Sequence, residues 1–192
     1  MQLKVPNWLS HLRLDRRGLP VPYVNRWGLE ENVDSLSLAY DPHVRMLAVF
    51  QDDSKEAIPD FTAQNMQRQR ECVMRELCQV CARPVPYSRR CVAISSVSVE
   101  TVFVDGADRA VIFEPWLCTR CAMFAVDRCP ALIRRKHDDD LTIFPIKRAS
   151  DFRITVSQGW IEGPFEQQSR ETSPAMWAKI ILDPSVVRIS AN

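Results

Sequence analysis

The chain has 192 residues, of which 46% are hydrophobic and 26% are charged, and its formal net charge is +1. These values are typical of a single globular domain with a real core, and they exclude an overall basic charge that would by itself attract nucleic acid or a membrane. No stretch approaches the roughly 20 apolar residues of a membrane span, and the N-terminus lacks the apolar segment of a secretory signal. The sequence therefore predicts a cytoplasmic protein whose seven cysteines are thiols rather than disulfides.

Residues 1–60 are predicted to form an extended arm of the single domain 1–192. Pro20 and Pro22 lie in an apolar run, which favours an edge strand or a polyproline-like segment packed on a surface. The sequence VRMLAVF, residues 44–50, predicts one short strand within this arm.

Residues 61–137 are predicted to contain a helix and then a metal-binding module. The stretch 61–77 has no Gly or Pro, and Thr62 can serve as an N-cap. A helix is therefore expected from about residue 63 to residue 77, with a partial apolar stripe along one face.

A β-hairpin is predicted inside the module. The segment 91–104 is rich in β-branched residues, and its alternation slips at Ser95 and Ser96, as a bulge would make it. The sequence DGAD, residues 105–108, is a hairpin turn signal, and 109–114 is the return strand.

The module is predicted to end in a helix that begins near Cys118 and is stopped or kinked near Pro130. Residues 138–192 are then predicted to supply strands that pack on the module. The strand candidates are 141–147, 151–157 and 185–190, with a short apolar stretch at 175–182 and a loop at 158–169.

Two Cys-x-x-Cys pairs are the strongest chemical signal in the chain. Cys78 and Cys81 lie in a knuckle after the first helix, and Cys118 and Cys121 lie at the start of the second helix. Two cysteines three apart in a tight turn can direct both sulfurs at one ion, and the free N–H groups of a helix N-terminus stabilise thiolate. Four sulfurs at about 2.3 Å complete a tetrahedron around Zn²⁺ and leave no open position.

The order of knuckle, β-hairpin and helix predicts an α+β fold with a treble-clef-like zinc site, in which the Zn²⁺ is structural. A thioredoxin-like redox centre would need one pair inside a βαβ pattern, which this sequence does not show. The other alternative is two unrelated pairs of buried thiols.

Three further cysteines are interpreted as core thiols. A helix rises about 1.5 Å per residue, so Cys129 lies about 12 Å beyond the second pair and Cys72 about 9 Å before the first. Cys91 could reach back through the intervening turn and replace a ligand, and this alternative stays open.

Four segments carry a resemblance to known proteins: RGLPVPYV (17–24), PDF (59–61), LCQVCARPV (77–85) and CTRCAMFAVDRCPAL (118–132). In these segments the chain resembles a group of small, largely uncharacterised double-Cys-x-x-Cys proteins of actinobacteria and their phages. The resemblance implies a zinc site and a prokaryotic or phage setting, and it carries no activity. Members of the group commonly have His in place of Cys118, which preserves a zinc ligand, and Gly in place of Ala82. An alanine in that turn costs about 1 kcal/mol.

Catalysis is not indicated by the sequence. A closed set of four thiolates has no position for water. An HNH-type nuclease, which also uses a treble clef, needs a His on the hairpin as general base, and the hairpin predicted at 92–114 contains none. The three histidines are His11, His43 and His137, and His137 stands beside Asp138–Asp140 in what reads as a solvated charged loop.

Two binding hypotheses follow. In the first, the zinc module presents a surface to a host or partner protein, because Tyr and Trp are enriched where interfaces are energetically important. The aromatic candidates, which could instead cap a small core, are Trp8, Tyr23, Trp27, Trp160, Phe165 and Trp177. In the second, basic residues around the zinc helix bind nucleic acid. These candidates are Arg83, Arg89, Arg90, Arg134, Arg135 and Lys136, with the basic residues of 68–75.

Overall fold

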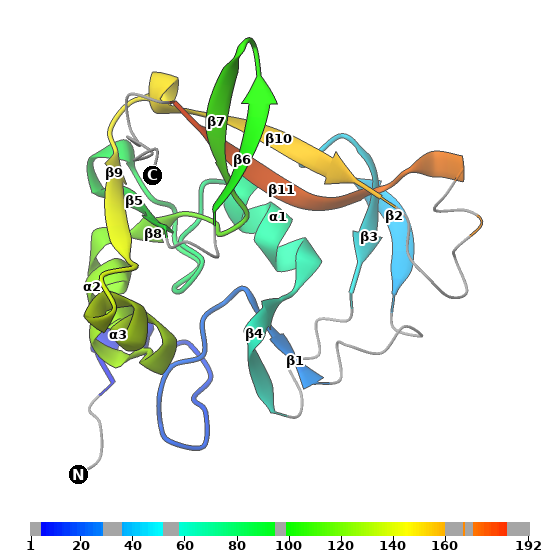
Figure 1. The fold of residues 1–192 in the computed structure, drawn as a ribbon. Helices are drawn as coiled ribbons and strands as arrows, with labels where there is room; N and C mark the ends of the chain where they lie inside the picture. The colour runs from blue at the N-terminus through cyan, green and yellow to red at the C-terminus, as the bar shows by residue number, and fades with distance from the viewer. Residues whose placement is uncertain are drawn as a thin grey trace.

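The computed structural model describes residues 5–28, 36–51, 58–94, 99–159, 167 and 171–183. Within them the chain is mixed α+β, with three α-helices and three β-sheets, of two, three and six strands (Figure 1). The predicted α+β class is therefore confirmed. No helix among the described residues is long and apolar enough to cross a membrane.

The N-terminal arm contains more regular structure than its sequence predicts. Strand β1 (Asn25–Trp27) pairs antiparallel with β4 (Pro59–Gln64) to make the two-stranded sheet. Strands β2 (Ser37–Asp41) and β3 (Met46–Phe50) form an antiparallel pair at one side of the six-stranded sheet. The strand predicted at 44–50 is confirmed as β3. Strands β1 and β2 are not predicted from the sequence: β2 pairs with the adjacent β3, and β1 pairs with β4, more than thirty residues later.

Helix α1 (Met66–Met74) begins three residues later than predicted. Its N-cap is Asn65, whose side chain accepts a hydrogen bond from the backbone N–H of Arg68 at 3.1 Å. Thr62 lies in β4 instead, because residues 59–64 pair with β1. Pairing with a distant strand therefore outweighs the local helix propensity of this stretch.

The six-stranded sheet is built around β11 (Ala175–Leu182), which crosses the molecule above α1 in Figure 1. Strand β10 (Phe152–Gln158) pairs with one edge of β11 along nearly its whole length. On the other edge β3 pairs with the beginning of β11 and β7 (Ala107–Ile112) pairs near its end. The strand predicted at 151–157 is confirmed, and the apolar stretch 175–182 is a central strand.

The gap that β3 and β7 leave along β11 is filled by polar side chains of α1. Gln69 is fully buried, and its side-chain amide donates to the carbonyl of Ala178 and accepts from its N–H, at 2.6 and 3.0 Å. Arg70, also fully buried, donates to Asp41 of β2 at 3.1 Å and to the carbonyls of Val49 and Met176. These bonds satisfy backbone groups that the sheet leaves unpaired.

The hairpin between the two cysteine pairs also differs from the predicted one. Strand β6 (Val99–Val104) pairs with β7 as expected, through a turn in which Asp105 and Gly106 have φ of 53° and 78°. Both positive φ values are those of the hairpin turn that an Asp-Gly pair favours. The first half of the predicted strand is instead β5 (Arg90–Ile94), which belongs to another sheet, and Ser95 and Ser96 lie outside the described residues.

The three-stranded sheet positions the second cysteine pair. Strand β5 pairs with β8 (Leu117–Cys118) and with β9 (Thr142–Ile146). Helix α2 (Thr119–Arg128) follows β8 directly, and α3 (Pro130–His137) follows α2 after a break at Cys129. The predicted stop near Pro130 is confirmed, because a proline has no N–H to continue the helix. The strand predicted at 141–147 is confirmed as β9, whereas 185–190 lies outside the described residues.

One buried cluster joins the cysteines to the C-terminal strands. Cys78, Cys81 and Cys121 pack in the same core as Trp116 of the segment before β8. Ala178, Ile180 and Leu182 of β11 complete this core, with Phe152 and Ile154 of β10 packed against it. Strands from the end of the chain are therefore packed on the cysteine-bearing segments.

Candidate metal centre

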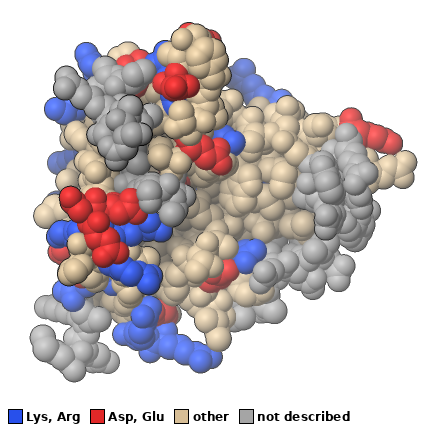
Figure 2. Space-filling model, viewed as in Figure 1, with Lys and Arg blue, Asp and Glu red and all other residues tan. Residues whose placement is uncertain are grey.

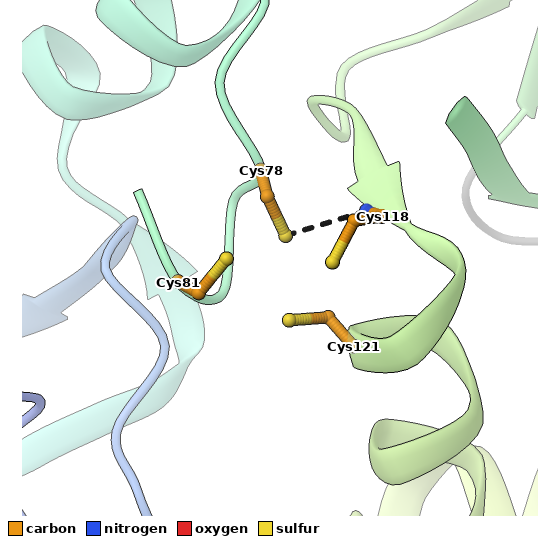
Figure 3. A group of neighbouring side chains, drawn as sticks. All are labelled: Cys78, Cys81, Cys118 and Cys121. Carbon is orange, nitrogen blue, oxygen red and sulfur yellow. Dashed lines mark hydrogen bonds between the residues drawn. The ribbon is translucent and has the colours of Figure 1, made fainter. Parts of the chain in front are cut away.

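The structure brings four cysteine sulfurs from two distant segments to one point. The Sγ atoms of Cys78, Cys81, Cys118 and Cys121 all lie within 4.8 Å of one another, and Figure 3 shows them directed inward. A tetrahedral Zn²⁺ with bonds of about 2.3 Å needs sulfurs about 3.8 Å apart, which lies within this limit. Three of the four residues are buried and Cys118 is half-buried. The donor set and the geometry fit zinc.

The first pair is held by a tight turn. The backbone N–H of Ala82 donates to the carbonyl of Cys78, and the N–H of Cys78 donates to the carbonyl of Arg83, each at 2.8 Å. Ala82 has a φ of 55°, in the left-handed region that a residue with a β-carbon enters at a cost. Ala82, the position at which the resembling proteins commonly have Gly, therefore adopts a backbone conformation that favours glycine.

The knuckle is anchored on both sides by backbone bonds. Gln79 donates from its N–H to the carbonyl of Trp116 at 2.8 Å, which joins the knuckle to the segment before β8. The N–H groups of Tyr23 and Val24 donate to Val80 and Gln79 at 3.1 Å each, which joins it to the arm. Sequence reasoning missed this contact, because the residues are more than fifty positions apart in the chain and only backbone atoms take part.

The second pair is held at the strand-to-helix junction. Cys118 pairs with Arg90 at the end of β8, and Cys121 lies in the first turn of α2. The backbone N–H of Cys118 donates to the sulfur of Cys78 at 3.4 Å (Figure 3). Backbone N–H donors of this kind stabilise the negative charge of a thiolate. This hydrogen bond also connects the first cysteine pair to the second.

The close approach of the sulfurs shifts their protonation. Hydrogen bonds from Cys121, Cys78 and Cys81 lower the pKa of Cys118 far below that of an ordinary thiol. The same contact with Cys118 raises the pKa of Cys121 and of Cys78, because these two thiols act as donors. A bound Zn²⁺ would displace these shared protons and stabilise all four thiolates.

The other cysteines lie apart from this group of four. Cys72 is fully buried with Val24 and Leu77. Cys91 is buried, its thiol donates to the carbonyl of Leu117 at 3.4 Å, and burial raises its pKa to about 11. Cys129 is half-buried at the α2–α3 break. The alternative in which Cys91 replaces a ligand therefore has no support in the geometry.

Arg90 has no role in a surface for nucleic acid, which corrects its selection from the sequence. Its side chain is 1% exposed and donates to both carboxylate oxygens of Glu76, at 3.1 and 2.7 Å. The guanidinium also lies over the rings of Tyr87 and Trp116, 4.2 and 4.8 Å from their centroids. Arg68 and Arg70, two of the basic candidates in 68–75, are also buried and cannot contact nucleic acid.

The remaining basic candidates lie at the surface. Arg135 pairs with Asp140 at 2.8 Å, which reduces its contribution to a positive surface. The exposed ones are Arg75, which pairs with Glu71, and Arg83, Arg89, Arg134 and Lys136.

The aromatic residues chosen from the sequence are less exposed than expected. Trp27 is buried, whereas Trp8 is half-buried and meets Phe124 edge-on at 6.0 Å. Tyr23 and Trp177 are half-buried, and Trp160 and Phe165 lie outside the described residues. Other side chains make up the exposed large apolar set of the described residues: Leu14, Tyr40, Ile58, Phe61, Tyr87, Phe103, Met123 and Ile133.

Comparisons with protein-family models, with curated proteins and with solved structures found no match to this chain. Its function is therefore inferred from the geometry of the chain itself.

Proposed function

We propose that this chain is a zinc-stabilised, non-enzymatic protein-binding module. In it Cys78, Cys81, Cys118 and Cys121 hold one structural Zn²⁺ in a treble-clef-like site. The observation that carries the proposal is the convergence of these four sulfurs, within 4.8 Å of one another, from segments 40 residues apart. The order of knuckle, antiparallel β5–β8 pair and helix α2 supports the treble-clef assignment.

A structural role for the Zn²⁺ follows from the ligand set. Four thiolates complete the tetrahedron of the ion, so no position is left for a water molecule or a substrate. A site of this kind contributes on the order of 10 kcal/mol to folding. Here the four side chains join the end of α1 to the start of α2, while the knuckle backbone holds the arm.

The positions of His11 and His137 do not indicate a catalytic site beside the proposed zinc site. The ring Nε2 of His11 lies 3.0 Å from the carbonyl oxygen of Cys81, where it supports the knuckle. His137 lies at the end of α3, exposed beside Asp138. Neither position supports an HNH-type nuclease.

Protein binding is supported by apolar side chains that are exposed together. Leu14, Ile58 and Phe61 are 49%, 56% and 45% exposed, and they line one hollow of about 540 Å³ with Trp27. Clustered exposed apolar residues mark interaction surfaces more often than scattered ones do. The partner protein, the cytoplasmic setting and a bacterial or phage origin are parts of the proposal that rest on the sequence.

The zinc assignment is tested by elemental analysis of the purified chain. We expect about one equivalent of zinc per chain, and its loss in the Cys78→Ser and Cys121→Ser variants with a lower melting temperature. Cys91→Ser and Cys129→Ser are matched controls that should keep the metal. Less than about half an equivalent of any transition metal in a chain that stays folded would refute the proposal.

Nucleic-acid binding is the alternative, and the same preparation decides it. Phosphate contacts by Arg83, Arg89, Arg134 and Lys136 would make affinity fall steeply as salt rises. No retention of DNA or RNA at about 50 mM salt would remove this alternative.

A further inference from the structure

A second hollow, of about 350 Å³, lies between the arm and the two helices that follow the zinc ligands. We name it the arm–helix groove. Its walls are the loop 17–25, Phe61 and Thr62 of β4, Val80 of the knuckle, and the stretch 124–134 of α2 and α3. Each of the four segments quoted for the resemblance contributes at least one side chain to this groove. It lies next to the first hollow, because Arg17 and Phe61 line both.

The groove has a mainly apolar lining that is open to a binding partner. Leu19, Pro20 and Val80 face it from the arm and the knuckle, and Phe124 and Ala131 from the helices. Small-molecule and peptide sites typically combine such a lining with a few convergent polar groups. The arm that makes one wall is held on the knuckle by backbone hydrogen bonds, so the groove is pre-formed.

The backbone on either side of Phe61 is held by a hydrogen-bonded turn, and the Phe61 side chain is 45% exposed. The backbone N–H and the hydroxyl of Thr62 donate to one carboxylate oxygen of Asp60, at 2.8 and 2.6 Å. Arg26 donates to the other oxygen at 2.8 Å. The β1–β4 register shifts here, so that Phe61 and its neighbours bulge out of the pairing. Because the backbone that carries this large apolar side chain is already held, little backbone entropy is lost when a partner covers it.

The charge of the groove selects an acidic partner. Arg17, Arg128 and Arg134 line it, and among the described residues no Asp or Glu does. Arg17 is paired with Asp15 at 2.9 Å, whereas Arg128 and Arg134 have no ion-pair partner in the described part of the chain. Figure 2 shows Lys and Arg side chains at the lower end of the molecule, near the loop that precedes β1 in Figure 1.

We infer that the arm–helix groove binds an acidic peptide segment of a partner protein. An apolar side chain of this segment packs between Phe61 and Phe124, and its carboxylates pair with Arg128 and Arg134. This inference rests on the proposed protein-binding function, and it names the chemistry of the partner. Arginine forks and aromatic anchors are the groups that dominate such interfaces.

The test uses the zinc-loaded full chain and a displayed library of random dodecapeptides. Enriched peptides should carry acidic residues beside an aromatic or aliphatic anchor, and a synthetic consensus peptide labelled with fluorescein gives the affinity by anisotropy. Phe61→Ser and Arg128→Glu should each weaken its binding at least tenfold. Phe103→Ser, a matched change at an exposed phenylalanine of β6, and Arg89→Glu, at an exposed arginine outside the groove, should leave it unchanged.

Three results would overturn the inference: no enriched peptide, a consensus without acidic residues, or an affinity that Phe61→Ser leaves intact. Retention of a DNA oligonucleotide that is lost in Arg128→Glu, with no enriched peptide, would assign the groove to nucleic acid instead. Zinc is measured on the same preparation. A chain with one equivalent of zinc and no peptide binding refutes the groove alone, whereas a folded chain without zinc refutes the zinc module.

Discussion

Replacing Gln69 with leucine should destabilise the attachment of α1 to the six-stranded sheet. The side-chain amide of Gln69 donates to the carbonyls of Phe113 and Ala178, at 2.5 and 2.6 Å, and accepts from the N–H of Ala178 at 3.0 Å. The two groups of Ala178 lie where neither β3 nor β7 pairs with β11. Leucine has nearly the same size and can make none of these bonds.

The expected loss can be worked from the groups left without partners. Ala178 is fully buried, so its N–H and C=O each cost about 1–3 kcal/mol when unpaired, while the half-buried Phe113 carbonyl can recruit water. Burial of the apolar leucine side chain in place of the amide stabilises the variant by about 1–2 kcal/mol. With the middle of each range, two unpaired groups at about 2 kcal/mol each less about 1.5 kcal/mol for the leucine, the net loss is about 2–3 kcal/mol. This is a large part of the 5–15 kcal/mol that stabilises a typical domain.

Urea unfolding of the zinc-loaded chain, followed by circular dichroism, measures this loss. Gln67→Leu is the matched control, because it makes the same change on the same helix at a half-buried position, and it should shift the free energy of unfolding by less than about 0.5 kcal/mol. A loss below about 1 kcal/mol for Gln69→Leu would show that the amide does not satisfy these backbone groups.

Two further predictions concern the knuckle and β4. Ala82→Gly should stabilise the folded chain by about 0.5–1 kcal/mol, because glycine takes the positive φ of this turn without strain; an unchanged or lower unfolding free energy would contradict this. The Thr62 and Arg26 hydrogen bonds lower the pKa of Asp60 below 3.8, so their stabilisation is present above that pH and is lost as pH falls through the folded-state pKa. Asp60→Asn should therefore be less stable than the parent chain at pH 7, by under about 1 kcal/mol, and the difference in unfolding free energy should shrink below pH 3.8; a constant difference would refute this.

The cysteine pairs illustrate what could be predicted locally. Spacing alone indicated that Cys78 and Cys81 share one turn and that Cys118 and Cys121 share one helix start, because both geometries depend on residues three positions apart. The same holds for the turn at Asp105–Gly106, where φ preferences act within two residues.

The misassigned residues share a different cause. Arg70 and Arg90 are charged residues that patterns place at the surface, yet both are buried because partners from other segments satisfy them. Thr62 is predicted as a helix N-cap but lies in β4, whose strand partner β1 lies more than thirty residues earlier. A short stretch of sequence around each residue contains neither the ion-pair partners of the arginines nor the strand that pairs with β4.

The sequence by itself determined the spacing of the four candidate metal ligands, the turns and the helix break at Pro130, since each follows from the covalent neighbourhood of a few residues. Only the tertiary structure decided the order of the sheets, the burial of the polar face of α1 and the arm–helix groove. These depend on which distant segments meet, as Gln69 and Ala178 do across 109 positions. Such contacts stabilise the fold only after distant segments have been brought together, so a local sequence pattern does not reveal them.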